Sequence, residues 1–292
     1  MIEVLHPGIF NTVQDRGRHG VARLGVPVAG ALDARSADAC NRALGNSVAD
    51  ALIEITMGQG RFRFTRPASI CLTGADISPR LDGSPIDMGR VVWATAGAVL
   101  VCGARRYGVR TYLGVRGGLR TEVVLGSRSF TNGLTQVRLA AGDVLACGED
   151  PGESVDPAER ADTPMDHFTA PELACTPGPE FDRLTTDQRR RLTSDFTISP
   201  SNDRVGYRLN EAIENRIEPI LSSAVLPGTV QLTPSGQLIV LMNDGPVTGG
   251  YPRVLQLTRD AVSRLAQRGS GDKVRFAHGR WTDGPWTMAW RR

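Results

Sequence analysis

Short apolar runs separated by glycine and proline recur along most of the chain. Runs of about four to eight residues between turn formers are typical of buried strands. They predict strands in the first half over 2–5, 52–56, 61–64, 69–73, 91–94, 98–102, 111–115 and 143–147. They predict strands in the second half over 195–199, 229–233, 237–242, 253–257 and 273–276. The pattern indicates a mainly β protein of two β-barrels, since each half has strands enough to close one.

Helical periodicity interrupts these runs in three places. Asp33 can cap a helix over 33–44, and further helices are predicted over 183–193 and 259–267. The segment 149–171 is rich in acidic residues, Pro and Ala without an apolar period, so we expect a linker or long surface loop. This places domains at 1–150 and 172–292, between which strands could be exchanged. His167 lies in the segment and is expected to be exposed to solvent.

Composition narrows the class of protein. The chain has 40% hydrophobic and 22% charged residues, and it lacks both a long apolar run and a signal-like N-terminus, so we expect a cytoplasmic protein without a membrane partner. The net charge is +3 and the arginines are spread among acids, which does not favour a nucleic-acid surface.

The only lysine, Lys273, excludes several mechanisms. It is not part of a phosphate-binding Gx4GK[ST] loop, and it does not lie between two methionines as a biotin-carrying lysine does. No serine-glycine run accompanies it, so a Ser-Ser-Lys amidase is excluded. We therefore expect no biotin attached to this chain.

The histidines give no metal-binding pattern. His6, His19, His167 and His278 are far apart, and the five cysteines have no paired spacing, so a metal site formed by this chain alone is not expected. His19 lies beside Arg18 in a polar segment, and it is the only histidine that we expect to take part in a functional site.

Four clusters of polar residues follow predicted strands. They are 11–20 followed by 25–33, 114–118 with 126–129, 201–209, and 237–253 preceded by 222–223 and 227–231. The last contains the strand and loop QLIVLMNDGPVTGGYPR. In this order they contain the motifs TVQDRGRHG, GVPVAGALD, LIEITMGQG, LTGAD, YLGVRGGL, LGSRS, DRVGYRL, PGTVQ and LMNDGPVTGGYPR. Together these motifs resemble the KipA family, which is also known as the family of the 5-oxoprolinase C subunit and was formerly called allophanate hydrolase subunit 2. This family is similar to the carboxyltransferase region of urea carboxylase.

The resemblance implies two related cyclophilin-like β-barrels with a few short helices. It also implies partners, namely a KipI-like B subunit and an A subunit of the LamB/YcsF type, and a small amide or lactam as substrate. In such systems the complex opens 5-oxoproline to glutamate with ATP as co-substrate, so this chain is expected to be inactive alone. Two alternatives remain open: a biotin-dependent carboxyl transfer to urea or a related amide, and a non-catalytic antagonist of a KipI-type kinase inhibitor.

Amide chemistry requires a base, orientation of a planar group and stabilisation of negative charge. The candidate catalytic carboxylates are Asp15 and Asp244, each as a base or as the group that orients an arginine. The candidate substrate-binding residues are Arg18 and Arg204 as an anion clamp, Gln231 and Asn243 for the amide, Gly249 and Gly250 as a backbone anion nest, and Thr248 and Tyr251 at the ligand's edge.

Several of these residues have a structural alternative. Asp15 and Arg18 can equally pair to hold their own loop, Asp244 can cap a turn, and Tyr207 with Arg208 can belong to the barrel wall. Glu54 in LIEIT is either on the solvated face of a strand or buried over the site, and alternation alone does not decide between them.

Overall fold

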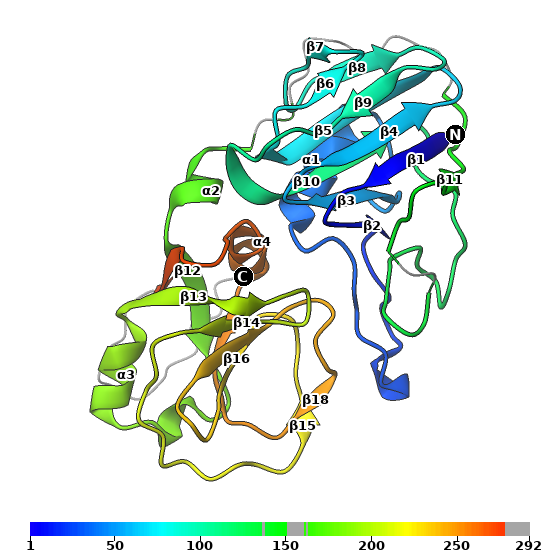
Figure 1. Cartoon of the computed structure of the whole chain (residues 1–292). Helices are drawn as coiled ribbons and strands as arrows, with labels where there is room; N and C mark the ends of the chain where they lie inside the picture. The colour runs from blue at the N-terminus through cyan, green and yellow to red at the C-terminus, as the bar shows by residue number, and fades with distance from the viewer. Residues whose placement is uncertain (136–137, 151–160, 162, 278–292) are drawn as a thin grey trace, which may run out of the picture.

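Figure 1 shows the computed structural model, in which two β-rich halves lie against each other. The structure describes residues 1–135, 138–150, 161 and 163–277. The predicted mainly β class is confirmed. Each sheet in this described part takes its strands from one half of the chain.

The first half contains two antiparallel sheets around one apolar core. The first sheet has six strands, in the order β11 (Val144–Leu145), β1 (Ile2–Pro7), β4 (Gly60–Phe64), β9 (Val99–Val101), β6 (Arg80–Leu81) and β7 (Ser84–Pro85). The second has five, in the order β2 (Phe10–Gln14), β3 (Leu52–Thr56), β10 (Tyr107–Val115), β5 (Ala68–Asp76) and β8 (Val91–Ala94). Side chains of both sheets, such as Val4, Phe62, Ile53 and Leu72, share one cluster. The sequence predicted a closed barrel here, whereas the structure has a core between two sheets.

The second half closes as a barrel. Its seven strands follow the order β12 (Glu172–Pro177), β19 (Arg253–Leu257), β16 (Thr229–Leu232), β17 (Leu238–Leu241), β14 (Gly206–Leu209), β13 (Asp195–Asn202) and β20 (Lys273–Ala277). Closure comes from the parallel pairing of β20 with β12. A separate two-stranded ribbon joins β15 (Ser223–Ala224) to β18 (Thr248–Gly249).

The three predicted helices are present. They are α1 (Ala34–Ala43), α3 (Thr186–Leu192) and α4 (Arg259–Leu265), to which the structure adds α2 (Asp166–Thr169) and the short 3-10 helices η1 (Ala22–Leu24) and η2 (Phe181–Arg183). The Asp33 side chain caps α1 by accepting a hydrogen bond from the Ser36 amide, as expected. In Figure 1, α4 lies between the two halves, where it contacts both α1 and β12. Among the described helices, none has the length and apolar character to cross a membrane.

Strand β2 was not predicted because its residues are mostly polar. Asn11, Thr12 and Gln14 are buried in it, although their sequence was interpreted as part of a polar loop. Strand β14 was not predicted either, because its motif DRVGYRL was interpreted as a polar cluster. The alternative that Tyr207 belongs to the barrel wall is confirmed, since its side chain lies in the barrel core. Gln14 Nε2 donates to the Thr12 hydroxyl at 3.0 Å, and Asn11 Oδ1 accepts from the Thr56 amide of β3 at 3.2 Å. A hydrophobic pattern does not reveal such pairings.

The predicted linker is in part a packed segment. Much of it falls at 151–160 and 162, outside the described residues, but its end contains α2. The prediction that His167 is exposed was wrong: the side chain is fully buried, with Nε2 2.9 Å from Oδ2 of Asp33. Phe168 packs against Tyr107 of the first half, with ring centroids 5.0 Å apart. The chain entering the second half is thus held against the first. The domain bounds 1–150 and 172–292 remain predictions.

Candidate functional site

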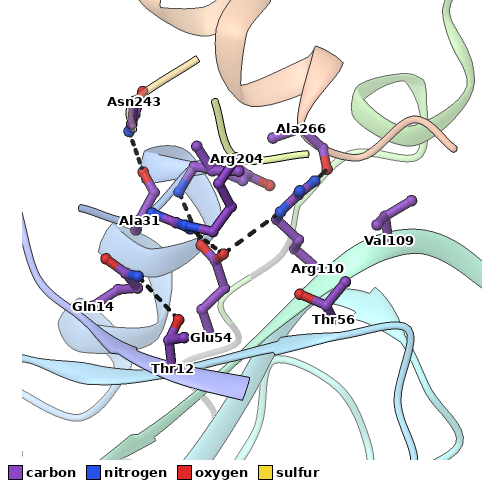
Figure 2. A network of polar contacts seen from close by, with 12 residues as sticks. Thr12, Gln14, Ala31, Glu54, Thr56, Val109, Arg110, Arg204, Asn243 and Ala266 are labelled. Atoms are coloured by element: carbon purple, nitrogen blue, oxygen red, sulfur yellow. Dashed lines mark hydrogen bonds and ion pairs between the residues drawn. The ribbon is translucent and has the colours of Figure 1, made fainter. Parts of the chain in front are cut away.

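Residues 29–33 join the two halves. The Ala29 amide donates to the Asn243 carbonyl at 2.8 Å, and Asn243 Nδ2 donates to the Ala31 carbonyl at 3.0 Å, as Figure 2 shows for the latter. The Leu32 side chain belongs to the apolar core of the barrel half. Gly30 has φ +86°, and a Cβ there would lie 2.9 Å from the Gly17 amide nitrogen. The sequence GVPVAGALD therefore forms a tight connection into the other half, which only glycine permits at position 30.

Glu54 is the buried acid at this junction. Its neighbours Ile53 and Ile55 face the core between the sheets, so alternation turns Glu54 toward the barrel half. Its Oε1 accepts from Nη1 of Arg204 at 2.5 Å, and its Oε2 accepts from the Tyr112 hydroxyl at 2.9 Å. In Figure 2 it lies between Arg204 and Arg110, whose Nε is 3.5 Å from Oε1. The buried interpretation of Glu54 is the correct one.

Arg204 connects Glu54 to the loop after β17. It forms a bidentate pair with Asp244, with Nε and Nη2 at 2.8 and 2.9 Å from the carboxylate oxygens, and it donates to the Gly30 carbonyl at 2.8 Å. Burial lowers the pKa of Arg204, but Glu54 and Asp244 outweigh it and raise that pKa above its usual value. Burial likewise raises the pKa of Asp244, which Arg204 partly offsets. Asp244 therefore orients an arginine, which was one of its two predicted roles.

A cleft of about 750 Å³ opens between the halves beside this junction. The first half contributes a wall of mixed character: Asp15, Arg16, His19, Val28, Ala31, Leu32 and Ala34. The second half contributes the facing residues Leu226, Asn243, Gln256, Arg259, Val262 and Ser263. Asp15, His19 and Asn243 were predicted for the site, so TVQDRGRHG and LMNDG do face each other across one cleft. A mostly apolar concavity with a few polar groups is typical of a small-molecule site.

Asp15 organises the loop that follows residue 124. Its Oδ1 accepts from the Ser127 and Ser129 hydroxyls at 2.6 and 2.5 Å and from the Gly17 amide at 2.8 Å, and its Oδ2 accepts from the Arg128 amide at 2.6 Å. Both carboxylate oxygens are thus occupied. LGSRS and TVQDRGRHG, which are distant in sequence, form one unit around this side chain.

Arg18 is only 1% exposed and forms hydrogen bonds with the same loop. Its guanidinium donates to the Val124 carbonyl at 2.9 Å, the Thr131 hydroxyl at 2.7 Å and the Ser129 carbonyl at 2.6 Å. Burial lowers its pKa, opposed by Asp15 and Asp244. Arg18 and Asp15 therefore hold the 124–131 segment rather than each other. Arg18 does not line the cleft.

The glycines of VTGGYPR lie outside this cleft. Gly249 is in β18, and neither Gly249 nor Gly250 has the positive φ that an αR-αL anion nest requires, so the expected nest is not formed by these two residues. A Cβ at Gly249 would lie 2.4 Å from Nε2 of Gln231, which is buried without a hydrogen-bond partner among the described residues. Close packing on Gln231 accounts for that glycine.

The other predicted residues of this stretch also lie beyond the cleft. Thr248 pairs with Ala224 in the two-stranded ribbon, and Tyr251 is 39% exposed. Arg253 is held by Glu180 through Nε and Nη2 at 2.9 and 2.8 Å, and these hydrogen bonds lower the pKa of Glu180 more than burial raises it. The predicted ligand-binding roles of Gln231, Thr248 and Tyr251 remain predictions.

Four polar residues of the cleft were not predicted: Arg16, Gln256, Arg259 and Ser263. Arg16 lies within a motif that was singled out, and its Nη2 binds Asp38 at 2.6 Å. Arg259 and Ser263 belong to α4, of which only the apolar positions were interpreted. They are one turn apart, and that i, i+4 spacing of polar residues beside an apolar face was the available signal.

No cluster of metal-binding side chains is found in the part of the chain that the structure describes. His278 lies outside that part. The polar groups that line the cleft are amides, the Ser263 hydroxyl, guanidinium groups and the His19 imidazole, together with one fully hydrogen-bonded carboxylate. Such a set binds an organic anion or amide rather than a hard cation, which requires several free oxygen ligands.

The chain thus combines a two-sheet half and a barrel half that meet across a cleft of mixed lining. The chain belongs to the family described as carboxyltransferase domain, subdomain A and B, whose model matches residues 24–278. It is 35% identical to the C subunit of 5-oxoprolinase from Escherichia coli (strain K12) over 94% of this chain and 90% of that protein. It is 26% identical to urea amidolyase of Lachancea kluyveri, over 94% of this chain and 17% of that protein.

The fold is also that of a solved structure. The crystal structure of TTHA0988 in space group P212121 superimposes with a TM-score of 0.85 at 30% sequence identity, over 94% of this chain. This chain spans about half of TTHA0988, at 55% of its length, so that protein has a further segment of comparable size.

Proposed function

We propose that this chain is the C subunit of an ATP-dependent 5-oxoprolinase, which opens 5-oxo-L-proline to glutamate together with a KipI-like B subunit and a LamB/YcsF-type A subunit. The observation that carries the proposal is the 35% identity to the C subunit of a 5-oxoprolinase, which extends over 94% of this chain and 90% of that relative. The cleft between the halves supports it, because its size and mixed lining suit a small cyclic amide.

In this proposal the cleft holds and orients the lactam. Asn243 uses its Nδ2 on the Ala31 carbonyl, which directs the amide oxygen to a position where it can accept the lactam N–H. Asp15 keeps the 124–131 loop in place at the cleft wall, and the Arg204–Asp244 pair fixes the loop that carries Asn243. ATP, as the co-substrate of the complex, would phosphorylate the lactam carbonyl oxygen with release of ADP. Water would then attack the carbonyl carbon, the C–N bond would break with a proton going to the nitrogen, and phosphate would be released. This division of labour is positioning by this chain within a shared active site.

Reconstitution tests the proposal. The chain is combined with the KipI-like and LamB/YcsF-type partners, and glutamate release from 5-oxo-L-proline is measured with and without ATP. We expect ATP-dependent glutamate release only when all components are present. No turnover with the full set would contradict the proposal, and tight binding to the KipI-like partner without any turnover would instead indicate the non-catalytic antagonist of a kinase inhibitor.

A second candidate is a carboxyl transfer from carboxybiotin to urea or a related amide. It is favoured by the 26% identity to urea amidolyase over 94% of this chain. The biotin would be on a separate protein, since Lys273 has the wrong neighbours for a carrier lysine. Urea-dependent turnover that avidin abolishes would support this candidate, and turnover unaffected by avidin would exclude it.

A further inference from the structure

One cationic side chain of the cleft has no counter-charge. Arg259 lines the cleft and makes no hydrogen bond or ion pair with any residue that the structure describes. The other charged groups there are satisfied, because Asp15 accepts four hydrogen bonds and Arg16 binds Asp38. The next residue, Asp260, binds Arg264 at 2.9 Å and Arg35 at 3.1 Å, and so does not neutralise Arg259.

The fold does not require a positive charge at this position. Arg259 is the first residue of α4, where the helix dipole disfavours a cation, and Thr258 already caps the helix by accepting from the Ala261 amide. Its backbone places its side chain on the face that also carries Ser263, one turn later, at the same cleft. The guanidinium is therefore available to a ligand.

The surroundings of Arg259 match a molecule that is apolar on one side and anionic on the other. Val262 of the same helix and Ala31 of the opposite wall contribute apolar surface, and Asn243 contributes an amide. The Ser263 side chain makes no hydrogen bond with the described residues, so its hydroxyl can serve as a second donor beside the guanidinium. A guanidinium with a hydroxyl next to it is a strong carboxylate site.

We propose that Arg259 binds the carboxylate of a small cyclic amide in this cleft and thereby selects anionic lactams over neutral amides such as urea. The inference rests on the proposed function for the identity of the amide. It assigns to one residue the discrimination between 5-oxoproline, which has a carboxylate, and ligands of the same size that do not. Arg259 is exposed in the free chain, so the discrimination comes from the carboxylate–guanidinium pair that the uncharged analogue cannot form.

The test compares two ligands that differ only in the carboxylate. 5-Oxo-L-proline and 2-pyrrolidinone are titrated calorimetrically into the wild-type chain, the Arg259→Gln variant and the Arg208→Gln variant, at low and high salt. Arg208 is exposed, its side chain makes no hydrogen bond or ion pair among the described residues, and it does not line the cleft, so it is the matched control. Wild type and Arg208→Gln should bind 5-oxoproline about tenfold tighter than pyrrolidinone or better, with a preference that falls as salt rises.

In Arg259→Gln the ratio of the two affinities should fall to about one, while pyrrolidinone binding is unchanged. Equal ratios in wild type and Arg259→Gln, or no binding of either lactam by the wild-type chain, would overturn the inference. The outcome is separable from that of the proposed function. ATP-dependent glutamate release that is insensitive to Arg259→Gln would support the proposed function and contradict the role of Arg259. Lactam binding that depends on Arg259, without turnover of the complex, would support the role of Arg259 and contradict the proposed function.

Discussion

Arg204 of the barrel half donates to Glu54 of the sheet half at 2.5 Å, and both side chains are buried. Because the same guanidinium also grips Asp244, the loop that contributes Asn243 to the cleft is held in place from the opposite half. This buried network of charges therefore links the two halves beside the cleft. Removing one member of such a group leaves another charge buried without compensation.

Replacing Arg204 should destabilise the chain strongly. Arg204→Gln removes the bidentate partner of Asp244 and leaves Glu54 with Arg110 alone as its counter-charge, and we expect a loss of about 3–5 kcal/mol in the free energy of unfolding. Urea unfolding followed by circular dichroism measures it. Arg208→Gln, the same change at an exposed position, should cost no more than about 0.5 kcal/mol. A similar small loss for both variants would contradict the role assigned to Arg204.

The contribution of Asp33 to stability should depend on pH. Burial raises the pKa of Asp33, but hydrogen bonds from His167, Ser36 and Gln267 outweigh it, so the folded-state pKa lies below the unfolded value. A depressed carboxyl pKa stabilises the fold above the unfolded pKa of about 3.9, and the stabilisation is lost as pH falls through the folded pKa.

Asp33→Asn should therefore cost roughly 1–3 kcal/mol near neutral pH, and the difference from wild type should shrink as the solution is acidified below about pH 4. Unfolding free energies over a pH series measure both effects. Asp187→Asn, at a side chain that is 88% exposed, should show little difference at any pH. If the difference in unfolding free energy between wild type and Asp33→Asn stays constant or grows on acidification, the pKa of Asp33 is not lowered by folding.

Asp15 should prove to be an organiser of the loop at the cleft wall. Asp15→Ala removes four accepted hydrogen bonds, so amide exchange at Arg128 and Gly17 should accelerate by about tenfold or more. Native-state hydrogen exchange measures this. Asp203→Ala, which removes an acceptor of the Val205 amide, should accelerate exchange only near that residue. If Asp15→Ala abolishes turnover of the complex with exchange unchanged, the carboxylate acts chemically instead.

The two glycines of VTGGYPR should tolerate a methyl group differently. Gly249→Ala places a Cβ 2.4 Å from Gln231 Nε2 and should cost about 1–3 kcal/mol through overpacking. At Gly250 the nearest atom to an added Cβ is the Ile220 carbonyl oxygen at 3.3 Å, and Gly250→Ala should cost less. Thermal and urea unfolding of both variants test this. Equal stability of the two variants, with lactam binding lost in both, would restore the predicted role of these glycines in ligand binding.

The sequence revealed the fold class because apolar runs and turn formers depend on local order alone. It also identified Asp15, His19 and Asn243 of the cleft, since each lies in a polar segment next to a strand. It did not reveal that the Arg204 guanidinium is fully paired with Glu54 and Asp244, because the pair with Glu54 joins residues that are 150 positions apart in the sequence. An arginine in a polar cluster looks the same whether it meets a ligand or two buried carboxylates.

Burial of polar residues was the main source of error. His167 was predicted to be exposed to solvent because its neighbours are acidic residues and prolines, yet its partner Asp33 lies in the first half, far away in the sequence. Arg259 was overlooked because it belongs to the polar face of its helix. Its helix was interpreted through its apolar face, and only the packing of α4 between the halves makes the polar face part of a cleft.

The central claim is that the cleft between the halves is where this chain contributes to 5-oxoproline opening. Ala34→Trp fills the cleft from the start of α1, and Ala49→Trp adds the same side chain at an exposed position outside it. Each is reconstituted with the KipI-like and LamB/YcsF-type partners, and ATP-dependent glutamate release is measured on complexes shown to assemble. We expect Ala34→Trp to lose turnover by about tenfold or more and Ala49→Trp to retain it. Full activity of Ala34→Trp, or no activity of the wild-type complex, would contradict the account.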